Sequence, residues 1–468
     1  MNESDKQKVR RWLGQFTVIA LLCLSVTAPA ISLSSALPYF KAEQLLLPLV
    51  IGVYAWLLLA GVTRKIRWNG MLVVGFLYCA CNAVSIWYGG EILGHRVSIR
   101  DYYELLKVWL PVAFFTISFE AGLSESSLRR LLNIFSLAIL SVCVYAWSQF
   151  LGLGFTYRLN SYYSSGGHID EALGYSRRVY GTMGNANVLG QLMSWCVVLF
   201  VLAALFVAGS RLRNSFTAVA CLVTLVMTGS RFGLLTVGVG LAVVFGFASF
   251  ATRRNFAHVA LLLLIIPALV GIYQVVASSN RRTLERYQTL RNPLQIDSLR
   301  ERLDGLWQDE WEDFKKSPIV GHGPAKTFYT SGYSDSEYLG VLREKGMIGL
   351  FSFLGYYLLP LHYLWKGQKA ARCLVGNARA ARTPATVVTI QAAFVMGVLA
   401  LLMDLGMSTF YSPFLQGFLW LWLGLGARAA ENLSFRPHLN SLSLNARTFA
   451  DQSPAPPGTR ERIGIGLH

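Results

Sequence analysis

The feature that most constrains the fold is a succession of long apolar runs, each about as long as a bilayer is thick. A membrane-spanning helix needs roughly 20 mostly apolar residues, and the 468-residue chain contains about twelve such runs, separated by shorter polar or basic segments. Since backbone polar groups must be satisfied within the bilayer, these runs are expected to be α-helices. The sequence therefore predicts an all-α polytopic membrane protein.

The predicted spans divide the chain into four parts. Residues 1–277 hold the first nine spans and a smaller external loop near 154–184, and residues 278–345 form a large external loop with short helices. Residues 346–428 hold the last three spans, and residues 429–468 have the composition of a disordered cytoplasmic tail. The spans are expected at approximately 12–33, 44–62, 69–88, 102–121, 131–153, 187–209, 215–228, 232–250, 256–277, 346–365, 384–407 and 412–426.

The distribution of charge sets the expected orientation. The chain has 54% hydrophobic and 14% charged residues and a formal net charge of +17. Its basic residues gather in short loops that the positive-inside rule assigns to the cytoplasm. We therefore expect cytoplasmic termini and two longer loops on the external face. Because topology accounts for the charge, no nucleic-acid partner is expected. The basic loops are 64–67, 129–130, 211–213, 253–254 and 366–382.

The first external loop mixes aromatic and hydrogen-bonding side chains, among them Tyr157, Arg158, Tyr175 and Arg178. Such a mixture binds sugars, because aromatic rings stack on the apolar side of a pyranose while polar groups bind its hydroxyls. It is equally typical of an interfacial aromatic belt with snorkelling arginines. Both interpretations stay open.

The large external loop ends in the polar stretch 318–349. His322 lies in a turn between Gly321 and Gly323, where the backbone can approach a ligand because glycine carries no Cβ. Lys326 follows shortly after. We expect the chemistry of the protein in this stretch.

Two carboxylates, Asp335 and Glu337, precede an apolar run that begins at Tyr338. Ser334 and Glu337 have the spacing of a capping box, in which the Ser334 side chain accepts a hydrogen bond from the Glu337 backbone N–H. The same carboxylates have the chemistry of a general acid or base. The two roles are compatible, and neither is decided by the sequence.

Arg231 lies between two apolar runs with almost no loop. An arginine so near the hydrocarbon is costly unless it faces a cavity or a partner, although it could also snorkel to the headgroups. Arg178, Arg302 and Lys326 are further cations on the external side. Guanidinium groups match phosphate oxygens in bidentate geometry. A polyprenyl diphosphate would fit this group, with its tail between helices and its sugars in the external loops.

Several short motifs occur in order along the chain: Gly181–Asn187, Thr228–Arg231, Arg302 with Trp307, Pro318–Gly323, and Glu337–Leu339 with Glu344, Gly346 and Gly349. Together they resemble the O-antigen ligase and polymerase family of Wzy-type polysaccharide polymerases and WaaL-like integral membrane glycosyltransferases. The resemblance covers roughly residues 178–349. It implies transfer of an undecaprenyl-diphosphate-linked glycan onto the next lipid-linked repeat unit at the periplasmic face of a bacterial inner membrane, which builds exopolysaccharide, capsule or O-antigen.

The resemblance also implies roles for residues. Arg231 and Arg302 would bind the pyrophosphate, and Arg178, Asn185 and Asn187 would shape the substrate cavity. It implies no cofactor and no metal. Both the donor and the acceptor would be lipid-linked glycans in the bilayer, and a chain-length regulator and a flippase are the protein partners expected.

One motif departs from the family pattern. Ligases of the family typically have a histidine motif where this chain has Asp335-Ser336-Glu337-Tyr338-Leu339, which favours a polymerase. Glu337 or Asp335 would then be the general base that takes the proton from the acceptor hydroxyl, with His322 as the substitute. Lys326 and Tyr338 would contact substrate. A direct displacement inverts the anomeric centre, and a retaining mechanism stays open.

Three alternatives remain. A ligase would move the glycan to a lipid A core or a protein. A transporter would use the charged residues Glu104, Lys107 and Asp404 within spans, although an ion pair between Glu104 and Lys107 explains those two more simply, and the chain shows no internal repeat. A nucleotide-sugar enzyme would use Asp335 and Glu337 to bind a metal, which their external placement disfavours.

Overall fold

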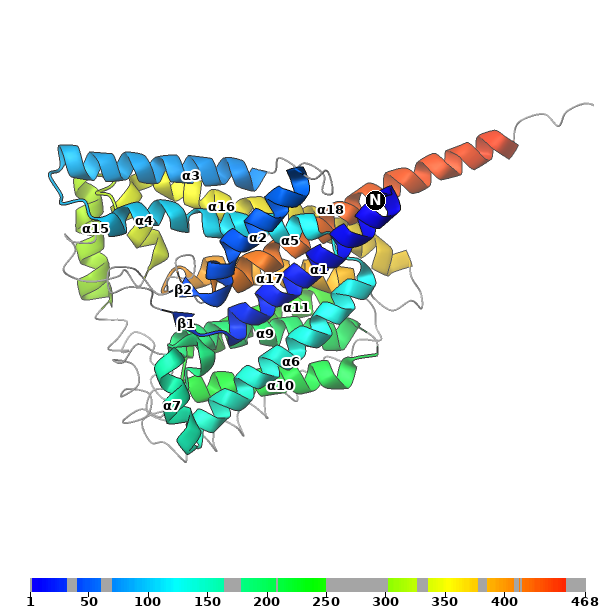
Figure 1. Cartoon of the computed structure of the whole chain (residues 1–468), viewed down its shortest axis with the longest axis horizontal. Coiled ribbons are helices and arrows are strands. Elements are labelled where there is room, and N and C mark those ends of the chain that lie inside the picture. The colour runs from blue at the N-terminus through cyan, green and yellow to red at the C-terminus, as the bar shows by residue number, and fades with distance from the viewer. Residues whose placement is uncertain are drawn as a thin grey trace, which may run out of the picture.

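A computed structural model shows a bundle of helices with one short strand pair. The two-residue strands β1, Ala30–Ile31, and β2, Phe40–Lys41, pair antiparallel. In Figure 1, α15, α7, β1 and β2 lie at one end of the bundle, and the start of α1 lies at the other. We call the first of these the loop end. The structure describes residues 2–31, 40–59, 70–163, 178–207, 209–249, 302–325, 336–377, 385–407, 412 and 415–451.

The described helices follow most of the predicted apolar runs. The run predicted at 256–277 lies outside the described residues. The helices are α1 (Glu3–Thr27), α2 (Ala42–Leu59), α3 (Gly70–Trp87), η1 (Tyr88–Ile92), α4 (Ile99–Lys107), α5 (Trp109–Ala121), α6 (Glu125–Phe150), α7 (Gly154–Tyr163), η3 (Gly181–Met183), α9 (Ala186–Phe206), α10 (Arg211–Thr228), α11 (Arg231–Ser249), η7 (Arg302–Leu306), α15 (Trp307–Lys316), α16 (Glu337–Asn377), α17 (Ala385–Met403) and α18 (Gln416–Asp451).

Among the described residues, 6 helices are long and apolar enough to cross a membrane. They are α1, α3 together with η1, α6, α9, α16 and α17. The prediction of an all-α membrane protein with several spans is confirmed. The count of twelve spans and the sides on which the loops lie stay predictions.

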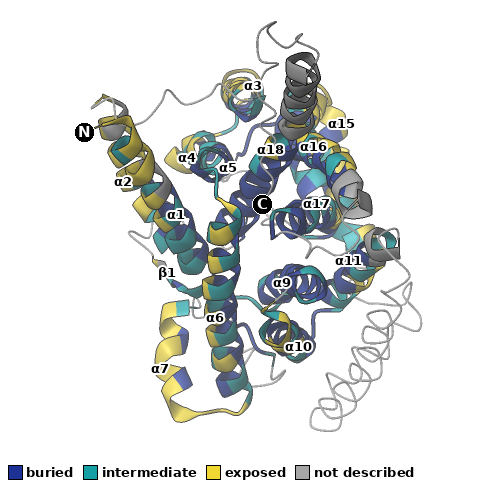
Figure 2. Ribbon diagram, turned by 90° about the vertical axis from the view of Figure 1, so that its right-hand side faces the viewer, coloured by how far each residue is buried: buried dark blue, intermediate teal, exposed yellow. Residues whose placement is uncertain are grey.

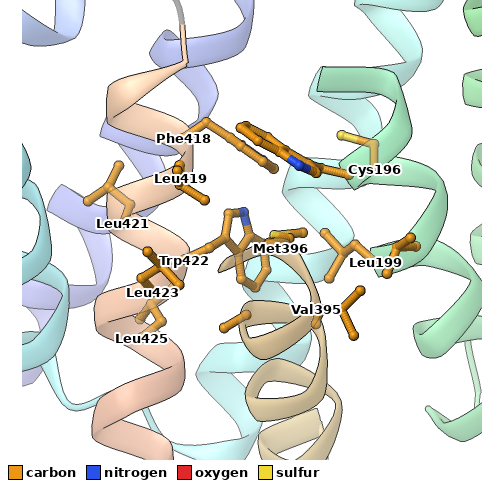
Figure 3. Close-up of a cluster of buried hydrophobic side chains, with 14 of the residues drawn as sticks. Cys196, Leu199, Val395, Met396, Phe418, Leu419, Leu421, Trp422, Leu423 and Leu425 are labelled. Atoms are coloured by element: carbon orange, nitrogen blue, oxygen red, sulfur yellow. The ribbon is translucent and has the colours of Figure 1, made fainter. Parts of the chain in front are cut away.

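Helix α9 lies at the centre of the bundle, enclosed by α6, α10, α11 and α17 (Figure 2). Most of its residues are buried, including the apolar side chains of both faces. Figure 3 shows the core beside it, which includes Phe418 and Trp422 of α18. The rings of Trp195 and Phe418 stack with centroids 5.8 Å apart. Stacked aromatic rings contribute beyond the area they bury, so this core fixes α9 against α18.

The span predicted at 102–121 is broken into α4 and α5. Pro111 lies in the first turn of α5, where proline is tolerated because the N–H it lacks has no partner there. Lys107 Nζ lies 2.9 Å from Glu104 Oε1. The ion pair proposed from the sequence is therefore present, and it accounts for two of the charges that the transporter interpretation needed.

The C-terminal helix differs from the sequence prediction. α18 continues to Asp451, well past Ala429, where we expected a disordered tail to begin. The helical part of the chain is thus longer than predicted. Residues 452–468 lie outside the described residues.

Side chains from three other segments bind the last carbonyl groups of α1. Lys41 Nζ donates to the Ser25 carbonyl, the Thr182 hydroxyl to Val26, and the Tyr163 hydroxyl to Thr27 over 2.9 Å. Terminal carbonyls lack partners within their own helix. Lys41 is fully buried there, and burial lowers its pKa to about 8, although the charge of nearby Glu43 opposes the shift. The end of α1 therefore ties together β2, α7 and η3.

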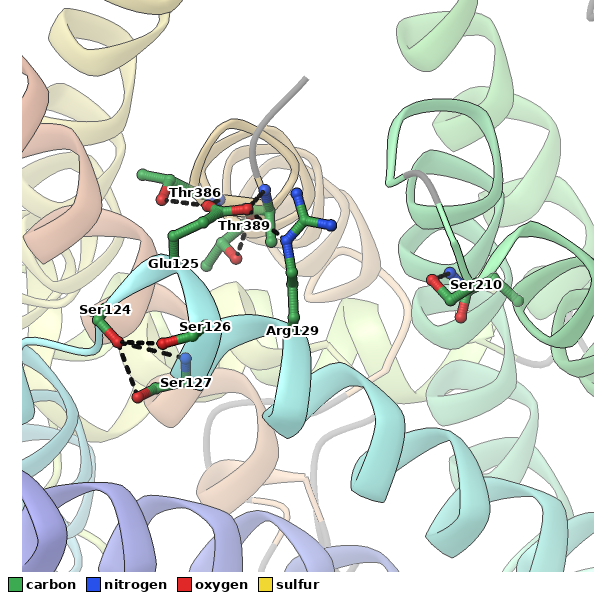
Figure 4. A network of polar contacts seen from close by, with 10 residues as sticks. Ser124, Glu125, Ser126, Ser127, Arg129, Ser210, Thr386 and Thr389 are labelled. Atoms are coloured by element: carbon green, nitrogen blue, oxygen red, sulfur yellow. Dashed lines mark hydrogen bonds and ion pairs between the residues drawn. The ribbon is translucent and has the colours of Figure 1, made fainter. Parts of the chain in front are cut away.

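The start of α17, at the opposite end of the bundle, is capped by a residue of α6 (Figure 4). Glu125 accepts from the backbone N–H groups of Ala385 (2.7 Å) and Thr386 (3.0 Å), and from the Thr386 hydroxyl. Arg129 donates to the same carboxylate over 2.8 Å. A carboxylate at a helix N-terminus satisfies free N–H groups and interacts favourably with the helix dipole.

We predict that Glu125→Ala destabilises the protein by about 1–3 kcal/mol, because it leaves the first N–H groups of α17 and the Arg129 guanidinium without their acceptor. Glu125→Gln, which keeps one acceptor oxygen, should have an intermediate effect. Thermal unfolding in nanodiscs measures the change. Glu3→Ala is the control, since the Glu3 side chain is 80% exposed and should leave the transition unchanged. Equal transitions for the Glu125 and Glu3 variants would contradict the capping role.

Candidate functional site

Arg178 joins two of the motifs found in the sequence. Its Nε donates to the Thr228 carbonyl over 2.7 Å, and its terminal nitrogen donates to Asn187 Oδ1 over 2.6 Å. Thr228 is the last residue of α10, and Asn187 lies in the first turn of α9. The two nitrogens of one guanidinium thus hold the end of one helix against the start of another.

The residues around this arginine have conformations that suit the contact. Asn185 caps α9, because its side chain accepts from the N–H groups of Asn187 (2.7 Å) and Val188 (3.4 Å). Gly229 ends α10 with φ +62°, a conformation that glycine adopts without strain. A Cβ on Gly229 would lie 3.5 Å from Arg178 Nε.

Arg231 begins α11 immediately after this turn and is half-buried. Its neighbour Ser230 is buried and accepts from the Gly233 N–H over 3.2 Å. A Cβ on Gly190 would lie 2.6 Å from the Ser230 Cβ, so α9 and α11 approach closely here. The backbone that carries Arg231 is therefore fixed by packing on both sides.

The end of α17 lies beside this turn. A Cβ on Gly406 would lie 3.7 Å from Phe232 Cε2, and Gln191 Nε2 lies 3.5 Å from the Met407 sulfur. The segment after α17 thus contacts both α11, next to Arg231, and the first half of α9.

Glu337 contacts the same segment. It begins α16, is buried, and donates its backbone N–H to the Asp404 carbonyl over 2.9 Å. Asp404 is fully buried. The next residue, Tyr338, donates its hydroxyl to the Leu401 carbonyl over 2.8 Å. Two buried acidic residues therefore lie on adjoining segments, at the end of α17 and the start of α16.

The capping box predicted from the sequence stays a prediction. The Glu337 N–H, which it assigns to Ser334, donates to the backbone carbonyl of Asp404. Ser334 itself lies outside the described residues. A residue distant in sequence satisfies the start of α16, which local spacing could not indicate.

The glycines of the turn make close contacts within the chain, and the predicted approach to a ligand stays a prediction. Gly321, Gly323 and Gly346 have φ between +63° and +78°. A Cβ on Gly321 would lie 2.4 Å from the Glu344 carbonyl carbon, and one on Gly346 would lie 2.3 Å from the Ile319 oxygen. The glycines let two segments of this chain approach each other. Gly346 also interrupts α16, so Glu337–Lys345 is a short helix of its own.

His322 is held from both sides of its ring. His322 Nδ1 lies 3.3 Å from His95 Nε2, and His322 Nε2 lies 2.8 Å from the Asp313 carbonyl oxygen. The side chain is almost entirely buried. These contacts give His322 a role in packing.

The remaining predicted residues are placed as follows. Arg302 is half-buried and begins η7, which leads directly into α15. Lys326 and Asp335 lie outside the described residues, so their predicted roles stay untested. Among the described residues, no group of three His, Cys, Asp or Glu side chains is arranged to hold a metal.

Sequence reasoning missed two ion pairs and one histidine in this region. Arg343 lies 3.4 Å from Glu310 with both side chains 4% exposed, and Lys345 lies 2.7 Å from Glu344. His95, in the connection between η1 and α4, carried no local signal. Asp404 did carry one, because an acidic residue at the end of a span is costly, but we had assigned it to a transport path.

The arrangement gathers cations and buried carboxylates at the loop end of the bundle. Arginines at the start of a helix, beside its free N–H groups, suit an anion. A carboxylate out of water suits proton transfer, since burial raises the free energy of its charged form. These groups could bind a phosphate and move a proton.

The comparison with protein families finds one match. Residues 216–354 match the model described as O-Antigen ligase. The matched segment includes Arg231, Arg302, the glycine turn and Glu337. The comparison with curated proteins finds no match.

We predict that Gly346→Ala destabilises the protein by more than the 1–3 kcal/mol of backbone strain alone, because the new methyl group would also overlap the Ile319 carbonyl. The measurement is thermal unfolding of the full chain in nanodiscs. Gly238→Ala is the matched control, since a Cβ at this helical position in α11 has no neighbour within 4 Å. A Gly346→Ala protein as stable as the control would show that the close approach does not matter.

Proposed function

We propose that this chain is a membrane glycosyltransferase that polymerises lipid-linked glycans, a proposal supported by the match of residues 216–354 to the O-antigen ligase family model. The donor is a growing oligosaccharide on undecaprenyl diphosphate, and the acceptor is the next lipid-linked repeat unit. The product is exopolysaccharide, capsule or O-antigen on the external face of the inner membrane.

One observation carries the proposal. The arginine turn that begins α11 and the buried start of α16 both contact the short segment after α17. An enzyme that breaks a glycosyl diphosphate bond needs cations for the leaving group and a carboxylate for the incoming hydroxyl, close to one another and to the bilayer. The family match and this arrangement support the same chemistry.

In the proposed reaction, a hydroxyl oxygen of the acceptor sugar attacks the anomeric carbon of the donor glycan. A new C–O glycosidic bond forms while the bond from the anomeric carbon to the diphosphate oxygen breaks. The hydroxyl proton goes to the carboxylate of Glu337, or to that of Asp335. The electron pair of the broken bond leaves with undecaprenyl diphosphate, whose negative charge is stabilised by Arg231 and Arg302.

In the proposed reaction, Arg178 positions other residues. Its guanidinium is engaged by Thr228 and Asn187, so we assign it to orienting the turn that presents Arg231. Because the bonds use two nitrogens of a planar fork, lysine cannot replace it.

A ligase is the second candidate. The description of the matching family model favours it, and the same donor chemistry would serve a lipid A core or protein acceptor. The acidic residues in place of a histidine motif favour the polymerase. The two candidates differ only in the acceptor, and an assay with both acceptors separates them.

The experiment uses the full chain in proteoliposomes with purified undecaprenyl-diphosphate-linked repeat units, in the presence of a chelator. Wild type should produce long lipid-linked glycans. Glu337→Gln should lower the rate by about 10²–10⁴-fold if Glu337 is the base, and Arg231→Ala by about 10²–10³-fold through loss of charge stabilisation. An unchanged rate in Glu337→Gln but a low rate in Asp335→Asn would assign the base to Asp335.

The matched controls are Arg211→Ala, at the start of α10 and exposed, and Glu3→Gln, which should both keep full activity. Extension only after a lipid A core or protein acceptor is added would show a ligase. No transfer to any acceptor would overturn the proposal.

A further inference from the structure

Two histidines from distant parts of the chain share a hydrogen bond at the loop end. His95 follows η1, and His322 lies in the glycine turn after α15, with the ring centroids 5.5 Å apart. The bond joins His95 Nε2 and His322 Nδ1 over 3.3 Å. Neither ring has a role in the proposed reaction.

The second bond of His322 determines which nitrogens carry protons. A backbone carbonyl can only accept, so His322 Nε2, 2.8 Å from the Asp313 oxygen, must donate. In a neutral ring the other nitrogen then accepts, and His95 Nε2–H is the donor to it. One added proton on His95 Nδ1 leaves this bond in place, and one on His322 Nδ1 is accommodated if His95 changes tautomer. Two added protons leave N–H groups facing each other, and the bond is lost.

The His322 segment is in turn bonded to the helix that carries Glu337. The His322 N–H donates to the Arg343 carbonyl over 2.9 Å, and the Gly323 N–H donates to the Glu344 carbonyl over 2.8 Å. Both acceptors belong to the short helix Glu337–Lys345. α3 contacts the same turn, because the Ser85 hydroxyl donates to the Val320 carbonyl over 2.7 Å.

We propose that His95 is a positioning residue that acts through His322 to hold the helix Glu337–Lys345 in place, and that acid pH releases this hold. For catalysis the inference rests on the proposed function, since the held helix begins with the candidate base. The hold itself is a property of the fold.

The charges around the pair are consistent with the direction of the pH effect. Burial and the neighbouring His322 lower the pKa of His95, while Asp313 opposes the shift. The ordinary pKa of a histidine, in an unfolded chain, is about 6.5. When its pKa is lower in the folded protein, the folded state loses stability as the pH falls through about 6.5, because the unfolded chain then binds more protons. Charged side chains on the surrounding elements are Glu91 in η1, Arg96 beside His95, Glu310, Asp313 and Lys316 in α15, and Arg343, Glu344 and Lys345 in α16.

The test is hydrogen exchange of the segment 337–345, measured on the full chain in nanodiscs at pH 7.5 and 5.5 and corrected for the intrinsic pH dependence of exchange. Wild type should lose protection in this segment at pH 5.5. His95→Ala should exchange about fivefold faster than wild type at pH 7.5, as expected when one hydrogen bond is removed, and should show no further loss of protection at pH 5.5. His95→Gln, whose amide N–H donates to His322 without titrating, should keep the protection at both.

The matched control is His362→Gln, an exposed histidine elsewhere in α16, which should behave as wild type. The inference would be overturned if residues 337–345 of His95→Ala were protected as in wild type at both pH values. It would also be overturned if His95→Gln lost as much protection at pH 5.5 as wild type does.

Transfer of lipid-linked glycan over the same pH range separates this inference from the proposed function. His95→Gln should retain more activity than wild type at pH 5.5. If the exchange results hold while no variant transfers glycan at any pH, the histidine hold stands and the glycosyltransferase assignment fails.

Discussion

The structure depends on hydrogen bonds that one element makes to the free end of another. The last carbonyls and first N–H groups of a helix have no partner within that helix, and a bilayer offers no water to satisfy them. In this chain they bind Glu125 at the start of α17, Lys41 at the end of α1, Arg178 at the end of α10, and the Glu337 N–H beside the end of α17. Each bond also fixes where two helices meet.

The candidate site follows from this constraint. Arg178 and the Glu337 backbone are both part of the network that satisfies helix ends, and the residues next to them, Arg231 and the Glu337 carboxyl, are the ones suited to chemistry. A helix terminus that is hydrogen-bonded by another element is both rigid and polar. These are the properties that a site for an anionic lipid-linked substrate needs.

Much of the fold could be predicted from the sequence, because apolar runs of bilayer length reveal helices whatever their arrangement. The broken span at α4 and α5 and the extension of α18 could not be predicted, since apolar composition does not show where a helix is interrupted or how far it continues beyond the apolar run. The ion pair of Glu104 and Lys107 was predicted correctly, because three-residue spacing places both on one face of a helix.

The site was predicted less completely. The motif around Arg178, Asn185 and Asn187 was found, and the structure joins it to the turn before Arg231. The glycines near His322 allow close backbone contact within the chain, which the sequence did not indicate, and their predicted approach to a ligand stays a prediction. His95 carried no signal because its partner is more than two hundred residues away, and no local pattern records such a pairing.

We propose that an anionic lipid is held at the start of α11, near the buried start of α16. The most direct measurement is an experimental structure of the full chain in nanodiscs with undecaprenyl diphosphate bound. We predict diphosphate density against the Arg231 side chain at the loop end, next to the segment after α17. Density at the opposite end of the bundle, near the Glu125 cap, would contradict it.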